Sequence, residues 1–256
     1  TSFTQRMGAD LNLQVNYTFA KAMDNSSTTI SGEVGDSTTQ NAYDMNADYS
    51  LADFYIKHNF VTNFTWMLPI GQGKKIAGNA GRLANAVIGG WQIAGVFSAL
   101  TGTPMSITSN NQLSHTLFGG TVRPDLAVGA KNNPLFEEPQ VRSVPGLFYF
   151  DRTAFVPQSG ARQGNPSGYY GNLGRNTVIG PGSNTVDLSF MKNNSLGEGR
   201  NLQFRAEMFN IFNRPNFAQP SAVVFDSAAA YVADAGRISA TVGSARQIQL
   251  ALRFTF

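Results

Sequence analysis

Arg246-Gln-Ile-Gln-Leu-Ala-Leu-Arg-Phe-Thr-Phe256 is the stretch that decides the fold class. From Gln247 onward its polar and apolar residues alternate without a break. Because successive side chains of a strand point to opposite faces, this pattern makes one fully apolar face and one polar face. Such a strand is unusual at the end of a soluble domain, whose termini tend to fray. It is typical of a transmembrane barrel, where the apolar face meets lipid and the polar face meets the lumen.

The composition agrees with a barrel. Charged residues make up 14% of the 256 residues, against roughly 25% in an average soluble domain, while 42% are hydrophobic and 11% aromatic. The chain has no run of about 18 apolar residues, so it has no candidate transmembrane helix. A low-charge, aromatic-rich chain without such a run fits a membrane barrel and also a secreted β-sandwich. Composition alone leaves both open.

Five further stretches alternate in the same way, and residues 1–6 read as the end of another strand. The alternating stretches are 9–21, 55–68, 90–100, 185–192 and 201–209. Their connections are shorter and longer in turn: 6–9, 69–89 and 193–199 are short, whereas 22–50, 101–182 and 210–235 are long. Barrels have short periplasmic turns and long extracellular loops, so the terminal strand is predicted to run towards the periplasm. A structureless loop as long as 101–182 is unusual, so short strands or a helix are expected within it.

This orientation predicts where the aromatic residues lie. Tyr17, Phe19 and Phe60 are expected at the outer membrane interface. Trp66, Trp91 and Phe256 are expected at the inner one. Aromatic girdles at both interfaces are typical of membrane proteins.

The predicted strands are too few for a complete barrel. The smallest transmembrane barrels have eight strands, and about six are found here. An open sheet edge in lipid leaves unpaired backbone groups that cost several kcal/mol each. Residues 1–256 are therefore expected to be the C-terminal portion, a fragment, of one larger outer-membrane β-barrel domain.

Longer blocks carry a family resemblance. Arg205-Ala-Glu-Met-Phe-Asn-Ile-Phe-Asn-Arg-Pro-Asn-Phe217 resembles a block of TonB-dependent receptors, particularly the Oar-like branch, in which the barrel follows a carboxypeptidase-regulatory-like domain. The alternating end of the chain resembles the terminal signal that the barrel-assembly machinery recognises. Further matching blocks are Tyr17–Lys21, Gly90–Gly95, Thr101–Pro104, Gly174–Thr177, Gly180–Gly182 and Asp187–Lys192.

The resemblance implies properties of a whole receptor. These are a barrel of about 22 strands, an N-terminal plug domain, and a periplasmic box contacting TonB, which supplies energy from the proton-motive force. The plug and the box are not recognisable in this stretch, so transport is expected of the parent chain. Implied partners are outer-membrane lipid, the plug domain, TonB, the barrel-assembly machinery and an unidentified ligand.

Four charged residues are the candidate site. Asp187, Arg205, Glu207 and Arg253 fall on the polar faces of the last three strands and are predicted to face the lumen. One interpretation is a network of paired charges that fixes the strand register and contacts the plug. The other is that they line a substrate path. Residues 210–216 and the loop 101–182 are candidate ligand contacts by position only.

Enzymatic, metal and nucleic-acid functions are not predicted. His58 and His115 are the only imidazoles and are far apart in sequence, and no nucleophile–base pair accompanies them. The absence of cysteine excludes disulfides and thiolate metal sites, and no cofactor is expected. The net charge of +3 comes from singly scattered basic residues, which gives no nucleic-acid surface.

The sequence thus predicts part of an outer-membrane TonB-dependent receptor that takes up a ligand. Two alternatives stay open. One is an adhesion or structural barrel without active transport, and the other is a soluble secreted glycan-binding β-sandwich.

Overall fold

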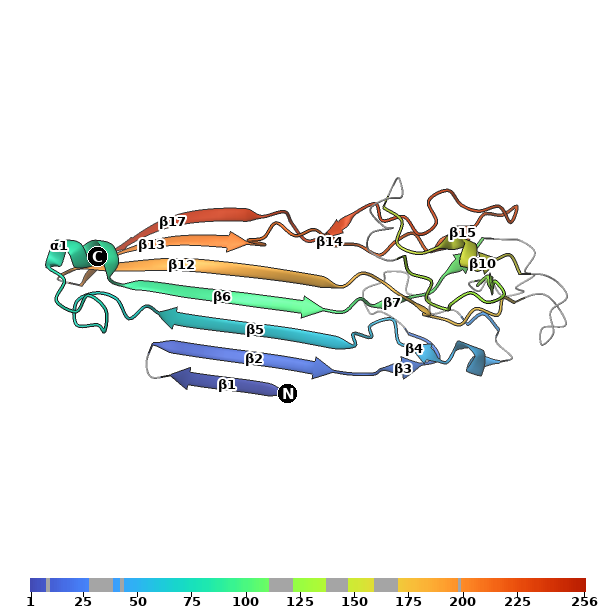
Figure 1. Cartoon of the computed structure of the whole chain (residues 1–256), viewed down its shortest axis with the longest axis horizontal. Helices are drawn as coiled ribbons and strands as arrows, with labels where there is room; N and C mark the ends of the chain where they lie inside the picture. Colours follow the sequence, from blue (N-terminus) through green and yellow to red (C-terminus); the bar gives the residue numbers. More distant parts are fainter. Residues whose placement is uncertain are drawn as a thin grey trace.

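A computed structural model describes residues 1–7, 10–27, 39–41, 44–110, 122–136, 147–158, 170–197 and 199–256. Its main feature is one sheet of seven strands in the order β1-β2-β5-β6-β12-β13-β17, in which every pair is antiparallel (Figure 1). The strands are β1 (Ser2–Met7), β2 (Leu11–Phe19), β5 (His58–Met67), β6 (Trp91–Leu100), β12 (Ser183–Gly197), β13 (Arg200–Phe209) and β17 (Gln247–Thr255). The predicted antiparallel barrel segment is therefore confirmed, as an open meander.

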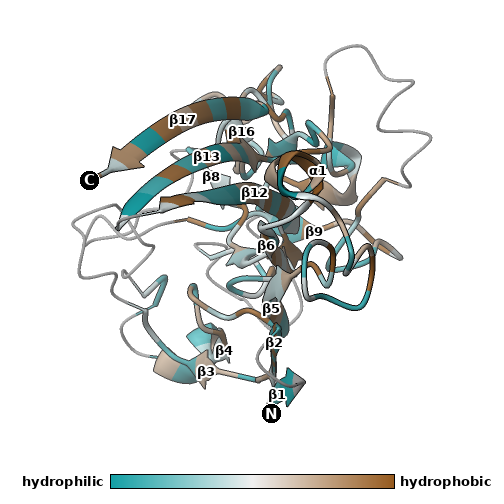
Figure 2. Cartoon of the chain, turned by 90° about the vertical axis from the view of Figure 1, so that its left-hand side faces the viewer, coloured by the Kyte–Doolittle hydropathy of each residue, from teal (hydrophilic) through white to brown (hydrophobic). Residues whose placement is uncertain are grey.

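The register aligns the alternating apolar residues of neighbouring strands, so that most of them share one face. Phe64 pairs with Gly95, which pairs in turn with Leu188, and Ala206 pairs with Leu250. A β-carbon on Gly95 would meet both the Phe64 ring and a Leu188 methyl at 2.7 Å. These two side chains thus cover the glycine and keep the apolar face continuous. Figure 2, seen nearly along the strands, shows the sheet as an arc and the alternating hydropathy of β17.

Two connections differ from the predicted ones. Strand β12 continues to Gly197 instead of ending at Lys192, because Asn193 and Asn194 stay paired with β13. The turn is correspondingly tight, and Gly197 and Gly199 supply its positive φ angles of 82° and 77°. The connection 69–89, predicted as a short turn without secondary structure of its own, contains the helix α1 (Arg82–Ile88). No helix among the described residues is both long and apolar enough to cross a membrane.

The three long loops contain short paired elements. Inside 101–182, as expected, lie β7 (Pro104–Met105), β8 (Thr108–Ser109), β9 (Asp125–Leu126), η2 (Arg152–Ala154), β10 (Phe155–Val156) and β11 (Val178–Ile179). The other two loops and the approach to β17 are also structured, which their polar composition did not predict. They contain β3 (Met23–Asp24), η1 (Met45–Asp48), β4 (Ser50–Leu51), β14 (Asn216–Phe217), β15 (Val223–Phe225) and β16 (Thr241–Val242).

These elements gather at one end of the sheet (Figure 1). The short strands pair among themselves: β3 with β4, β7 with β11, β9 with β10, β8 with β15, and β14 with β16. We call the described residues of 20–57, 101–182 and 210–246 the loop module. It has its own core, in which Phe150, Phe155, Ile107 and Phe225 are at most 1% exposed. Helix α1 and the C-terminus lie at the opposite end of the sheet.

Candidate functional site

The polar face of β13 bears a pair of opposite charges. Arg205 and Glu207 are two residues apart and therefore share one face, with 3.6 Å between Arg205 Nη1 and Glu207 Oε1. Arg205 Nη2 also donates to Gln203 Oε1 at 3.3 Å. Gln203 Nε2 in turn donates to Asn193 Oδ1 at 2.9 Å, which links β13 to β12. Both charged side chains are more than 30% exposed, so the pair is accessible from the polar side of the sheet.

The other two predicted charges lie on the same face but outside this pair. Asp187 Oδ1 accepts a hydrogen bond of 2.8 Å from the backbone N–H of Asn210, just beyond β13, and so anchors the loop that follows. Arg253 is directly opposite Gln203 in the register and forms no ion pair within the described residues. The four residues therefore share a face, but only Arg205 and Glu207 form an ion pair. That this face lines a lumen stays a prediction.

The predicted interface aromatics divide between the two ends of the sheet. Tyr17 pairs in register with Phe60, and Phe19 with His58, at the end that carries the loop module. Trp66, Trp91 and Phe256 lie at the end near α1 (Figure 1). Their positions relative to a membrane stay a prediction.

Lys192 departs from the apolar pattern, because it lies on the apolar face at the α1 end. Its Nζ is 5.6 Å from the centre of the Trp91 ring and donates to the Gly89 carbonyl oxygen. The apolar stem of Lys192 thus lies along the apolar face, while its ammonium group reaches polar partners at the α1 end of the sheet.

His58 belongs to an aromatic cluster. Its Nδ1 is 2.8 Å from the Tyr17 hydroxyl oxygen, and its ring centre is 5.3 Å from that of Phe19. His115 lies outside the described residues. Within the described part of the chain, no three His, Asp or Glu side chains gather in a way that could hold a metal ion.

Two buried arginines join residues 20–57 of the loop module to residues 101–182, and the sequence predicted a role for neither, although Arg175 lies in the block Gly174–Thr177. Arg175 is 2% exposed; it contacts Asp24 and Asp53 as ion pairs, the latter at 3.2 Å, and donates to the Asp48 carbonyl oxygen at 3.1 Å. Arg123 is also 2% exposed, with its Nη2 2.7 Å from Asp48 Oδ1 in an ion pair that lacks hydrogen-bond geometry. Arg175 thereby joins Asp24 and Asp48 to a position more than a hundred residues later in the chain.

Two glycine-containing blocks of the family resemblance meet in this module. Strand β7 pairs with β11, which brings residues 101–104 beside 180–182. A β-carbon on Gly102 would collide with the carbonyl oxygen of Gly180. The backbones of the two blocks, which are far apart in sequence, therefore touch at the end of β6 and β12 that carries the loop module.

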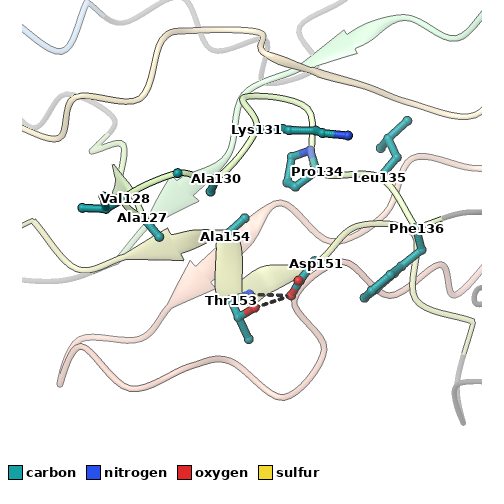
Figure 3. A pocket seen from close by; sticks show the side chains of 11 residues that line it. Ala127, Val128, Ala130, Lys131, Pro134, Leu135, Phe136, Asp151, Thr153 and Ala154 are labelled. Atoms are coloured by element: carbon teal, nitrogen blue, oxygen red, sulfur yellow. Dashed lines mark hydrogen bonds between the residues drawn. The ribbon is translucent and has the colours of Figure 1, made fainter.

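Two hollows open on the loop module. The smaller, of about 460 Å³, lies beside the turn 127–131 and includes Asp151 (Figure 3). The Asp151 carboxylate is already hydrogen-bonded to a neighbouring residue: its Oδ1 accepts hydrogen bonds from Thr153 N at 2.8 Å and from Thr153 Oγ1 at 2.7 Å. The larger hollow, of about 970 Å³, lies between the outer end of β5, β6 and β12 and the loop module.

Comparison with known proteins identifies the family. No curated protein and no solved structure matches the chain. A family model described as an outer membrane beta barrel domain matches residues 1–249. This match agrees with the antiparallel meander, its single apolar face and its structured loops at one end. It places the protein in the bacterial outer membrane, and the chain belongs to the outer membrane beta barrel domain family.

Proposed function

We propose that this chain is the C-terminal barrel part of a TonB-dependent receptor, which imports a ligand across the outer membrane. The observation that carries the proposal is the exposed Arg205–Glu207 pair on the polar face. Lumen walls are polar in barrels, and a charged pair accessible from that side provides a contact for a plug. Arg205 and Glu207 also begin the block Arg205–Phe217 that resembles these receptors.

Further strands would complete the barrel. One side of β1 and one side of β17 lack a neighbouring strand among the described residues. Unpaired backbone groups in lipid cost several kcal/mol each, so both edges require partners. A closed barrel would also enclose the polar face.

The loop module would form the ligand-binding entrance. It lies at the end of the sheet where the long connections are, and long loops of barrels are extracellular. Its buried ion pairs join the described parts of the first two loops, and the pairing of β8 with β15 joins the second loop to the third. The chemical class of the ligand is not specified by the described residues.

Uptake that depends on TonB is the test. The full-length receptor would be expressed in matched strains with and without TonB, and cellular accumulation would be followed for a panel of siderophores, oligosaccharides and peptides. We expect receptor-dependent accumulation that disappears without TonB or when the proton-motive force is dissipated. Cell-surface binding without any TonB-dependent accumulation would instead support the adhesion or structural barrel.

The soluble sandwich is not retained. Its apolar face would be covered by a second packed sheet, whereas the long strands here form one sheet within the described residues. The match to an outer-membrane family also opposes a soluble location.

A further inference from the structure

The larger hollow has an apolar floor and an apolar roof. Its floor includes Phe60 and Ala99, which are paired in register across β5 and β6. Leu135, Leu147 and Ile238 of the loop module also line it. At about 970 Å³ it is at the upper end of the size range of ligand pockets. The space is therefore suited to a hydrocarbon chain.

The hollow opens on the face opposite the charged pair. Phe60 and Ala99 belong to the apolar face, because they continue the alternation of Phe64 and Gly95. The strands β5, β6 and β12 are in the middle of the sheet, with a paired strand on each side. Strands that complete the barrel would add to the edges and would leave this face uncovered. A cargo molecule in the lumen would not reach it, whereas a membrane lipid would.

Among the described residues that line the hollow, Arg214 carries the one permanent positive charge and none is a carboxylate. Arg214 is exposed and its guanidinium forms no ion pair within the described residues. Its backbone is held by Asn210, whose side chain accepts from Arg214 N and donates to Arg214 O, both at 3.0 Å. Tyr149, another lining residue, donates to the Ile179 carbonyl oxygen at 3.0 Å, and burial raises the pKa of its phenol. The described part of the lining is therefore positive and mainly apolar, which complements an anionic amphiphile.

We propose that this hollow binds an anionic phospholipid of the outer leaflet, one whose headgroup carries a net negative charge. The acyl chain would lie along Phe60 and Ala99, and the phosphate would contact Arg214, whose planar guanidinium suits phosphate oxygens. The aromatic cluster of Tyr17 and Phe19 beside His58 is at the same end of the apolar face. Such a site would hold the loop module against the membrane surface. It depends on the apolar face being towards lipid and does not depend on transport.

Lipid retention by the full-length protein tests the site. The detergent-purified receptor would be placed in bilayers of phosphatidylcholine with a minor fraction of phosphatidylglycerol, re-extracted, and examined for bound lipid by native mass spectrometry. We expect selective retention of phosphatidylglycerol. Arg214→Gln should reduce that retention about tenfold, the effect of losing one charge-assisted hydrogen bond. Ala99→Trp, which fills the floor, should reduce it as well.

Lys131→Gln is the matched control, because Lys131 is an exposed cation of the same module that lines the other hollow (Figure 3). It should retain as much phosphatidylglycerol as the unmodified receptor. Equal retention of the two lipids, an equal loss in Lys131→Gln, or competition by inorganic phosphate or oleate as strong as by phosphatidylglycerol would overturn the proposal. Heat-modified electrophoretic mobility would verify that each variant is folded. TonB-dependent uptake is measured separately, so either proposal can fail alone.

Discussion

All the buried apolar residues that the structure describes lie in the loop module, and the seven-stranded sheet has none. In the sheet, polar and apolar residues alternate along each strand instead. Apolar residues of neighbouring strands, such as Ala206 and Leu250, lie opposite one another on the same face. In a membrane, lipid covers that face, so the sheet needs no protein layer over it. The loop module buries its own apolar side chains, as a protein region surrounded by water must.

The difference extends to polar groups. In the sheet, the backbone N–H and C=O groups of paired strands hydrogen-bond to one another in a regular ladder. The loop module has short strands only, so side chains such as Arg175 and Asn176 must reach carbonyl oxygens that no ladder satisfies. We therefore expect substitutions in the two regions to act through different mechanisms and to be detected by different measurements.

The largest effect is expected from Arg175→Ala. Removing Arg175 leaves Asp24 and Asp53 without their buried partner, which should destabilise the loop module by about 3–5 kcal/mol. Hydrogen exchange of the full-length protein should show faster exchange in the module, with strand amides of β12 and β13 unchanged. Arg237→Ala is the control, since its pair with Asp234 is exposed on both sides and should contribute little. Equal exchange in both variants would contradict the proposed role of Arg175.

Leu250→Arg should act on the sheet rather than on the loops. Leu250 is on the apolar face, where a charge near the bilayer midplane costs about 2–4 kcal/mol. The neighbouring Gln249→Arg places the same charge on the polar face and should be tolerated. The comparison is the yield of folded protein in isolated outer membranes, and similar yields would show that the two faces are assigned incorrectly.

Gly102→Ala should affect the junction between the two regions. The added β-carbon would collide with the Gly180 carbonyl oxygen, and forcing extra volume into such a contact costs about 1–3 kcal/mol. Gly81→Ala has open space and an ordinary φ of −63°, so it should change little. Protease resistance of the loop module measures the difference. A Gly102→Ala protein as resistant as Gly81→Ala would mean that the contact adapts without cost.

The smallest effect on stability is expected from Arg205→Gln. Its pair with Glu207 is partly exposed, with 3.6 Å between the charged atoms, so the loss should be below about 1 kcal/mol. If the pair contacts a plug, TonB-dependent uptake should fall although the yield of folded receptor is unchanged. Arg253→Gln is the comparison, since Arg253 shares the face and forms no described ion pair. Unchanged uptake in Arg205→Gln would leave the pair with a structural role only.

The alternation in the sequence was sufficient to predict the sheet. A strand of a transmembrane barrel has one face towards lipid and one towards the lumen, so its sequence alternates with a period of two, as residues 247–256 do. The boundaries were less certain where polar residues continue a strand. Asn193 and Asn194 read as a turn, yet they remain paired because β13 provides partners on the adjacent strand.

The loop module was decided by tertiary structure. Arg175, Asp24 and Asp53 come from segments with no periodicity, and their proximity depends on how two long loops pack against each other. Likewise, Phe60, Ala99 and Arg214 share a hollow only because the loop after β13 returns to the outer end of β5 and β6. The local sequence pattern is sufficient to predict a strand with one face towards lipid, because successive residues alternate between an apolar and a polar environment. Loop packing depends on contacts between residues distant in sequence, which a local sequence pattern cannot predict.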